Sequence, residues 1–385
     1  MKTNSMKYLI AINFLTMFVM AVSSALKGVL VPTFKDAFAV NNTQIGLMLS
    51  ISLLVSMIFT YLGSRLCEKY RSKRIIMIGV FASAVTFFLT SYSTSFTMLF
   101  IGHLAAGGSA SLLIIGLNTT VPFLPVTYKA LLMNMLHFFY GIGVMISQKV
   151  SGFLLVNNYS WNYLFRVCSI LFIINLILLI FMNDVDNKPN YLTKNADDSS
   201  SNMLMLVLIT LALGFAISAE IHTSNWFINY MKEIYLYNEN KATYLTAIFF
   251  AMFSASRFFG GFISEKFGYI RTVTFSIIFA TFFYIAGYTL GESGLIIISF
   301  SGLFIGLIYP TTLIFSSNLF KNSSSSTIGI ITSSVTFITF VTGIILGYAN
   351  DIIGVYLSYA LMPIFLIISS ILYILVYRIS KDSFN

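Results

Sequence analysis

Apolar residues in this sequence form long, nearly unbroken runs that are separated by short polar segments. A bilayer core about 30 Å thick is crossed by roughly 20 apolar residues in a helix, and runs of this length recur along the whole chain. The short alternating segments of an outer-membrane barrel are absent from the pattern. We therefore predict an all-α membrane protein. Its twelve spans are expected at approximately 8–34, 43–65, 74–94, 97–122, 130–156, 161–183, 203–231, 242–264, 272–290, 294–318, 326–348 and 353–378.

The longest polar stretch between these runs, residues 184–202, is rich in Asp, Asn and Ser and has no apolar period. Such a segment is typical of a flexible linker. Six predicted spans precede it and six follow it. The chain is therefore expected to form an N-terminal six-helix bundle at 1–183, a cytoplasmic linker, and a C-terminal six-helix bundle at 203–385.

Composition agrees with the hydropathy pattern. Of the 385 residues, 57% are hydrophobic and only 9% are charged, whereas soluble domains are about 25% charged. The net charge of +9 does not indicate a nucleic-acid partner, because the basic residues fall mainly in short loops, where membrane orientation explains them. Cys67 and Cys168 lie at different predicted depths, so neither a disulfide nor a metal site is expected.

Positive charge also predicts the orientation. If the N-terminus is cytoplasmic, fifteen Lys and Arg residues fall on the inner side, and only Lys35, Lys232 and Lys241 fall in outer loops. Cytoplasmic loops are enriched in basic residues. We therefore expect a multi-pass plasma-membrane protein, monomeric in the lipid bilayer, with both termini in the cytoplasm.

Two basic phrases repeat at a constant offset of 197 positions: GSRLCEKYRSKR at 63–74 and GGFISEKFGYIR at 260–271. The conserved order includes the pairs Gly63/Gly260, Glu68/Glu265, Lys69/Lys266, Tyr70/Phe267 and Arg74/Arg271. Both phrases follow the second span of a six-span half. Two such halves related by a repeat are a known transporter plan, in which the substrate binds between the halves near mid-membrane.

Both phrases resemble the loop signature of the major facilitator superfamily, although Glu68 stands where that signature usually has Asp. The resemblance implies a latch in which an acid and an arginine hold helix ends and control switching, here Glu68, Arg74, Glu265 and Arg271. Arg257, near the predicted inner end of the eighth span, is assigned to the same gate.

Several longer phrases resemble the fucose-permease-like sugar transporters of that superfamily. They are SSALKGVLVPTFKDAFAVNNTQIGL at 23–47, LMNMLHFFYGIG at 132–143, AEIHTSNWFINYM at 219–231, SASRFFGGFISEKFG at 254–268 and GLFIGLIYPTT at 302–312. The resemblance implies proton-coupled uptake of a monosaccharide or sugar derivative by alternating access, without a cofactor. Gly28 and Ile114 occupy places where those relatives can carry acids, so proton coupling of that design is absent.

Glu220 is the one acid among thirteen that is predicted well inside a span. Charged side chains at membrane depth usually face a bundle interior or a water-filled path. A carboxyl group in a low-dielectric site can bind and release a proton near neutral pH. We expect Glu220 to couple protons or bind substrate; a structural ion pair is the alternative.

Lys27 ends a polar stripe with Asn13, Thr16, Met20 and Ser23, whose spacing places them on one helical face. Such a stripe is expected to line the central cavity. Lys27 is then a partner for Glu220 or an anchor for an anionic or hydroxyl-rich substrate. The alternative is that its ammonium group reaches toward the outer surface of the membrane.

Further candidates are polar or aromatic residues of the predicted spans. His137 and Asn134 share a face of the fifth span; His137 can titrate near neutral pH or bond a sugar hydroxyl, or be purely structural. Asn118, Asn225 and Trp226 are expected to line the cavity, because amides bond hydroxyls and an aromatic face packs on a sugar ring. Trp226 is equally explained as an anchor at the membrane interface.

Three other functions remain open. The four basic residues predicted inside spans suit a carrier of organic anions or sugar acids, and the Met- and Phe-rich spans suit proton-linked efflux of lipophilic compounds. A sensor that kept the fold is the third. A membrane enzyme is disfavoured, because no paired nucleophile and base share one depth. No Gly-rich nucleotide loop is present, so the expected energy source is an ion or solute gradient.

Overall fold

The computed structural model describes residues 3–120, 129–181, 200–320 and 324–384, and these residues are almost entirely helical. Twelve of the described helical segments are long and apolar enough to cross a membrane. The first half contains α1 (Thr3–Val29), α2 (Val31–Phe38), α3 (Asn42–Lys69), α4 (Ser72–Thr90), α5 (Phe96–Thr120), α6 (Lys129–Val156) and α7 (Trp161–Ile180). The second contains α8 (Ser200–Tyr235), α9 (Glu239–Phe267), α10 (Tyr269–Thr289), η2 (Gly291–Gly294), α11 (Leu295–Phe300), α12 (Gly302–Ile305), α13 (Ile308–Leu319), α14 (Ser324–Ile352), α15 (Gly354–Tyr359) and α16 (Leu361–Phe384).

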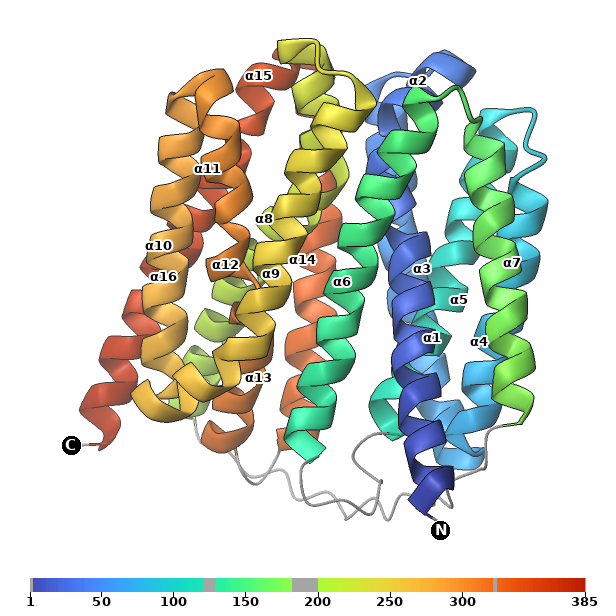
Figure 1. The fold of residues 1–385 in the computed structure, drawn as a ribbon. Helices are drawn as coiled ribbons and strands as arrows, with labels where there is room; N and C mark the ends of the chain where they lie inside the picture. The colour runs from blue at the N-terminus through green and yellow to red at the C-terminus, as the bar shows by residue number, and fades with distance from the viewer. Residues whose placement is uncertain (1–2, 121–128, 182–199, 321–323, 385) are drawn as a thin grey trace.

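The helices form two bundles that stand side by side, as Figure 1 shows. The bundles meet mainly where α6 packs along α9 and α3 packs along α14, with α1 against α8 between them. Both chain termini lie at the same end of the molecule (Figure 1), which we call the termini-bearing face; the other end is the opposite face. The predicted linker at 184–202 lies almost entirely outside the described residues, and α8 already begins at Ser200.

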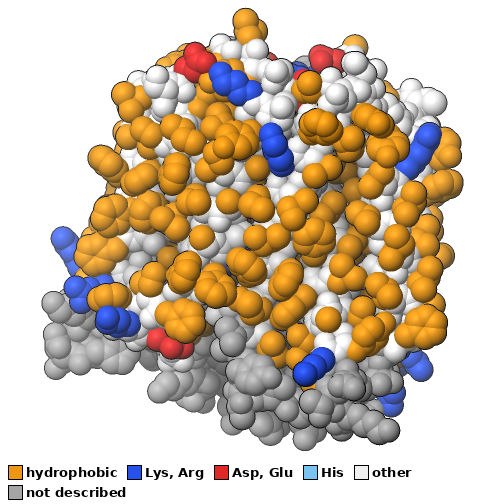
Figure 2. Space-filling model, viewed as in Figure 1, with side chains coloured by type: hydrophobic (Ala, Val, Ile, Leu, Met, Phe, Trp, Pro, Cys, Tyr) orange, Lys and Arg blue, Asp and Glu red, His pale blue; other side chains and the backbone are white. Residues whose placement is uncertain are grey.

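The surface fits a protein surrounded by lipid. Hydrophobic side chains cover the flank of the molecule in Figure 2, and most charged side chains gather toward its two ends. Exposed large hydrophobic residues include Ile58, Phe81 and Phe282 on three different spans. In water, patches of this extent would cause aggregation. The expected all-α membrane fold with twelve spans is therefore confirmed.

Close contact between the halves depends on glycine at particular positions. A Cβ added at Gly46 of α3 would lie 2.8 Å from the Cα of Gly347 in α14, so any side chain there would force the helices apart. A Cβ at Gly28 of α1 would collide with the backbone carbonyl of Ser224 in α8. Small residues allow such close helix approach in membranes.

Three predicted spans are not continuous helices, and one of them, 353–378, is divided between α15 and α16 at residue 360. The first predicted span, 8–34, ends as α1 at Val29, and a separate helix follows with Pro32 in its first turn, where the missing proline N–H is not needed. The tenth, 294–318, is divided among short helices, with a break at residues 306–307 between α12 and α13. Pro310 explains part of this break, because it has no N–H to donate to the carbonyl of Gly306, four residues earlier.

Candidate functional site

A buried ion pair lies between α8 and α9. Glu220 sits near the middle of α8, and its Oε1 is 4.0 Å from Nη2 of Arg257 in α9. The two side chains are only 16% and 10% exposed. The second carboxylate oxygen, Oε2, has no hydrogen-bond partner among the described residues. One oxygen of a buried carboxylate is therefore free to meet a proton or a ligand.

The position of Arg257 follows from the break in the tenth span. Its Nε donates a hydrogen bond of 3.2 Å to the backbone carbonyl of Gly306, the group that Pro310 leaves without a helical donor. Its guanidinium carbon also lies 4.2 Å from the centre of the Phe253 ring, a favourable cation–π contact. Arg257 is thus held between α9 and the interrupted helix.

Side chains from the other half reach the same place. Tyr140 of α6 lies within electrostatic reach of both Glu220 and Arg257, and His137, also on α6, lies near Arg257. Tyr309 of α13 interacts with both charges as well. The ion pair is therefore located where the two bundles meet, between α6 on one side and α8, α9 and α13 on the other.

An ion pair of this kind can link protonation to ligand binding. A buried ion pair is neutral as a unit, and removing one charge leaves the other unpaired in a low-dielectric site. Protonation of Glu220 would leave Arg257 available to a substrate oxygen. The phenol groups of Tyr140 and Tyr309 can donate and accept hydrogen bonds. Protonation of Glu220 and binding of a solute at Arg257 can thus favour each other.

Lys27 occupies a different place from the one expected. Its side chain lines a small cavity inside the N-terminal bundle, together with Thr86, His103 and Phe165. The expected pair between Lys27 and Glu220 is not formed, since Glu220 pairs with Arg257. Lys27 forms no ion pair with any described residue. It therefore faces the interior of one bundle, whereas the polar stripe predicts that it faces the central path.

The predicted amide and tryptophan candidates are spread along the molecule. Asn134 faces Gly261 at the seam between α6 and α9, nearer the termini-bearing face than His137. Asn118 lies near the end of α5, and its Oδ1 has no partner among the described residues. Asn225 borders the contact between α1 and α8. Trp226 is only 2% exposed, so it packs in the core and is not an anchor at the membrane interface.

The predicted latch residues lie apart from the ion pair. Arg74, Glu265 and Arg271 are exposed, and none forms an ion pair with another described side chain. The side chain of Glu68 lies outside the described part of the chain. The position of Arg257 in the sequence predicts that it belongs to this latch. In the structure it instead contacts Glu220 and the carbonyl of Gly306. We therefore assign Arg257 to the central site.

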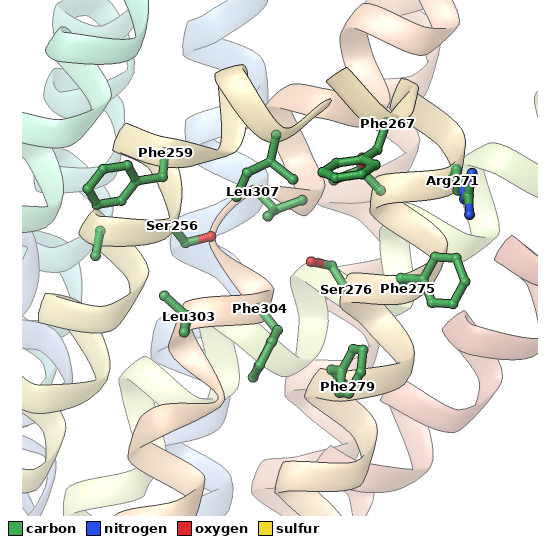
Figure 3. A pocket seen from close by; sticks show the side chains of 13 residues that line it. Ser256, Phe259, Phe267, Arg271, Phe275, Ser276, Phe279, Leu303, Phe304 and Leu307 are labelled. Atoms are coloured by element: carbon green, nitrogen blue, oxygen red, sulfur yellow. The ribbon is translucent and has the colours of Figure 1, made fainter. Parts of the chain in front are cut away.

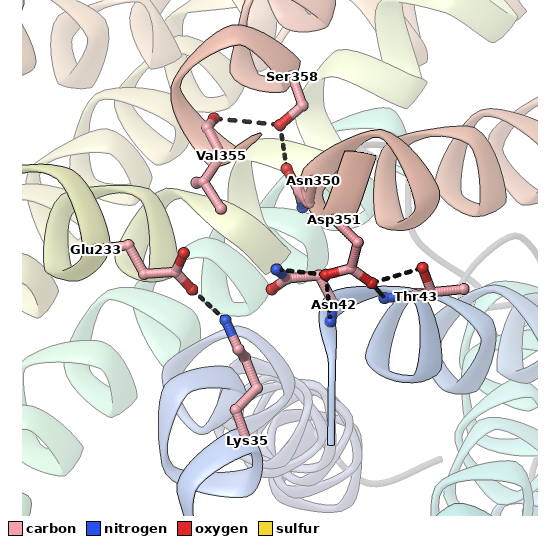
Figure 4. Close-up of polar contacts among 8 residues, drawn as sticks. All are labelled: Lys35, Asn42, Thr43, Glu233, Asn350, Asp351, Val355 and Ser358. Carbon is pink, nitrogen blue, oxygen red and sulfur yellow. Dashed lines mark hydrogen bonds and ion pairs between the residues drawn. The ribbon is translucent and has the colours of Figure 1, made fainter. Parts of the chain in front are cut away.

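A second polar site, which no local sequence pattern indicates, joins the halves at the opposite face. Asp351 at the end of α14 accepts four hydrogen bonds from the start of α3 (Figure 4). Its Oδ1 accepts from the N–H (3.1 Å) and Nδ2 (2.9 Å) of Asn42, and its Oδ2 from the N–H (2.7 Å) and hydroxyl (2.6 Å) of Thr43. A carboxylate at a helix N-terminus also interacts favourably with the helix dipole.

Two further contacts join the halves at this face. Lys35 of α2 forms an ion pair with Glu233 of α8 (Figure 4). Lys149 of α6 donates a 2.8 Å hydrogen bond to Asn240 of α9. These contacts join the two halves at the opposite face.

Two six-helix halves that meet around a buried ion pair and are joined by polar contacts at one face are typical of membrane transporters. Residues 12–219, more than half of the chain, match the family model described as the Major Facilitator Superfamily. The chain belongs to this family of transporters.

Curated relatives show the family at low identity. The chain is 22% identical to the class H tetracycline resistance protein of Pasteurella multocida over 187 residues, 48% of this chain and 47% of that protein. It is 20% identical to the cis,cis-muconate transport protein of Acinetobacter baylyi over 262 residues, 64% of this chain and 63% of that protein. The matches thus span roughly half to somewhat under two thirds of these relatives.

Solved structures match over nearly the whole chain. A bacterial homolog of the human lysosomal transporter Spinster, inward-facing and unoccupied, aligns with a TM-score of 0.78 at 14% identity and 98% coverage of both chains. A D-xylose-proton symporter aligns with a TM-score of 0.77 at 14% identity, covering 95% of this chain and 96% of that one. At this identity the similarity shows the fold alone, and the fucose-permease-like branch stays a prediction.

Proposed function

We propose that this protein is a proton-coupled secondary transporter that takes up a monosaccharide or sugar derivative by alternating access. The observation that carries the proposal is the Glu220–Arg257 pair, placed at the junction of the two halves with one carboxylate oxygen unpartnered. Likeness of the phrases at 132–143 and 219–231 to fucose-permease-like transporters supports a sugar, and those phrases contain His137 and Glu220.

The proposed cycle begins with Glu220 ionised and paired with Arg257. A proton neutralises the carboxyl group, and Arg257 then donates its N–H groups to a substrate oxygen. Tyr140 and Tyr309 bond further hydroxyl groups of the solute from the two halves. The two halves rock around the bound solute, and this motion alternately breaks and restores the contacts at the opposite face. The site is therefore exposed to one side at a time. Release of solute and proton restores the pair.

Orientation and location belong to the same proposal. The excess of Lys and Arg near the termini-bearing face supports placing that face in the cytoplasm. The opposite face, closed by Asp351 and Lys35, then faces outward. The conformation described would thus be closed toward the outside of a plasma membrane.

A second candidate solute is an organic anion or sugar acid. Arg257 supports it, because a guanidinium group binds a carboxylate in a bidentate geometry, and protonation of Glu220 would remove the competing internal carboxylate. The muconate transport protein among the relatives agrees with this chemistry. Because the chain is also similar to a tetracycline resistance protein, export of a lipophilic compound should be measured as well.

The test is solute flux in proteoliposomes that contain the purified protein. Labelled monosaccharides and the corresponding sugar acids are offered with and without a pH gradient, and expulsion of a lipophilic dye is followed in parallel. The wild type should accumulate a sugar only when the pH gradient is present. Glu220→Gln should lose this accumulation and keep solute exchange at equilibrium, because Gln resembles the protonated carboxyl group.

Glu292→Gln is the matched control, since Glu292 is a well-exposed acid at the opposite face and should leave coupling intact. Proton-driven accumulation that survives in Glu220→Gln would refute the coupling role. Arg257→Gln separates the two solute classes: it should abolish uptake of a sugar acid, whereas a neutral sugar should lose affinity only in part.

A further inference from the structure

A cavity of about 500 Å³ opens on the flank of the C-terminal half, between α9, α10 and the α12–α13 region (Figure 3). None of its lining residues belongs to the central site described above. Phe259, Phe275 and Phe279 line it and are each about half exposed. In a chain embedded in a bilayer, such residues face the acyl chains of the lipid. The cavity is therefore a groove that is open to the membrane.

The groove has one charged end. Arg271, in the first turn of α10, lines it at the termini-bearing face, and its guanidinium carbon lies 5.9 Å from the centre of the Phe275 ring. Arg271 forms no ion pair with any described residue. Lys266 lies at the same end, with its ammonium group over Phe267. Positive charge is thus present at this end of the groove, where the exposed Glu265 neighbours Lys266 but pairs with neither Lys266 nor Arg271.

The rest of the groove is lined mainly by apolar side chains, and its length corresponds to part of a lipid acyl chain. Phe279 lies eight positions after Arg271, so α10 rises about 12 Å toward mid-membrane between them. Two buried hydroxyls in the wall, Thr272 and Ser256, have no hydrogen-bond partner among the described residues. They are 7% and 3% exposed. Thr272 is adjacent to Arg271, at the depth where glycerol esters lie.

We propose that this groove binds an anionic phospholipid from the leaflet at the termini-bearing face. Arg271 binds the phosphate, because guanidinium and phosphate form charge-assisted hydrogen bonds. The hydroxyl of Thr272 donates to an ester carbonyl. One acyl chain lies against Phe275, Phe279 and Leu303. The assignment does not depend on which solute the protein carries.

The test uses fluorescence quenching by lipids with brominated acyl chains. Trp161 and Trp226, the chain's two tryptophans, are replaced by Phe, and Phe279→Trp places a reporter in the groove. Proteoliposomes contain phosphatidylcholine with either brominated phosphatidylglycerol or brominated phosphatidylcholine. One Arg near an anionic surface contributes about 1 kcal/mol. Phosphatidylglycerol should therefore associate with the groove about five-fold more strongly than phosphatidylcholine. Arg271→Gln should reduce this ratio to about one.

A matched reporter controls for ordinary lipid contact. Phe282 lies on the same helix, is 65% exposed and does not line the groove, so Phe282→Trp should show a ratio near one. Ser276→Phe, which fills the groove, should weaken quenching at position 279 and leave position 282 unchanged. Native mass spectrometry of the otherwise unmodified protein provides a second readout, in which Arg271→Gln should retain less phosphatidylglycerol than the wild type.

Equal headgroup ratios at positions 279 and 282 would overturn the proposal. So would a preference for phosphatidylglycerol that persists in Arg271→Gln. A third outcome would also contradict the proposal: both brominated lipids quench equally at position 279, and an added lipophilic compound reduces this quenching. The groove would then bind a solute dissolved in the membrane and not an anionic phospholipid.

Discussion

Replacing Asp351 with Asn should shift the protein toward conformations that are open at the opposite face. The change keeps the size of the side chain but removes its charge and one acceptor oxygen. Asn can still accept the two hydrogen bonds from Asn42 through its carbonyl oxygen. Its NH₂ group would then face the N–H and hydroxyl of Thr43, which now donate 2.7 and 2.6 Å bonds to Oδ2. Two charge-assisted hydrogen bonds between the halves are therefore lost.

The magnitude follows from those two bonds. A hydrogen bond to a charged group contributes about 1.5–3 kcal/mol when well shielded. Asp351 is exposed, so solvent screening reduces this contribution, and we take about 1 kcal/mol for each bond. The closed conformation should lose about 2 kcal/mol, which is roughly 30-fold in the equilibrium constant. An open state populated at about 1% would rise to roughly a quarter.

Pulsed electron paramagnetic resonance measures this shift directly. Cys67 and Cys168 are replaced by Ser, and spin labels are attached at Asp36→Cys and Leu236→Cys, exposed positions in different halves. Asp351→Asn should add a clear population at longer distance. A distance distribution identical to that of the unsubstituted protein would refute the reasoning.

Lys35→Gln is the control for that experiment. It breaks the exposed pair with Glu233, whose side chains are 18% and 35% exposed. Exposed ion pairs contribute about 0–1 kcal/mol, so this variant should shift the equilibrium by less than about five-fold. A shift as large as that of Asp351→Asn would mean that helix capping has no special role.

Three further substitutions test other features of the structure. Pro310→Ala restores an N–H that competes with Arg257 for the Gly306 carbonyl; with about 1 kcal/mol at stake, solute affinity in proteoliposomes should fall about five-fold, and unchanged affinity would contradict the role of the break. Gly28→Ala adds a Cβ that collides with α8; overpacking costs about 1–3 kcal/mol, so the Tm in detergent should fall, and an unchanged Tm would show that the helices can separate without cost. Lys27→Met removes a cation that has no acidic partner among the described residues, so the Tm should rise; a fall, or a loss of anion uptake, would give Lys27 a functional role.

Most of the span boundaries follow from hydropathy because the bilayer imposes a nearly one-dimensional constraint. The predicted span 43–65 corresponds to Asn42–Cys67, and 203–231 corresponds to Met203–Tyr235. Predictions fail where a proline changes local helix geometry. The runs at 8–34 and 294–318 stay apolar on average across these breaks, so hydropathy does not separate α1 from α2 or α12 from α13.

The sequence indicates one of the two charged residues of the central site, Glu220, but not its partner. Glu220 is found because one carboxylate inside an apolar run is costly, and that requires only the local sequence. Its partner Arg257 is not indicated by the sequence, because the expected span 242–264 puts it near an end and so with the gate. In the structure α9 continues to Phe267, and the side chain turns toward α8 and α13.

The sequence by itself determined the class: an apolar chain with twelve spans, a repeated basic loop and one acid deep in the membrane. These are properties of short segments, and the bilayer acts on each segment separately. Only the tertiary structure decided which charges meet. Glu220 pairs with Arg257 and not with Lys27, and Asp351 accepts hydrogen bonds from the start of α3, some 300 residues earlier. Helical periodicity fixes the face on which a side chain lies, but the packing of the bundles decides what that face contacts.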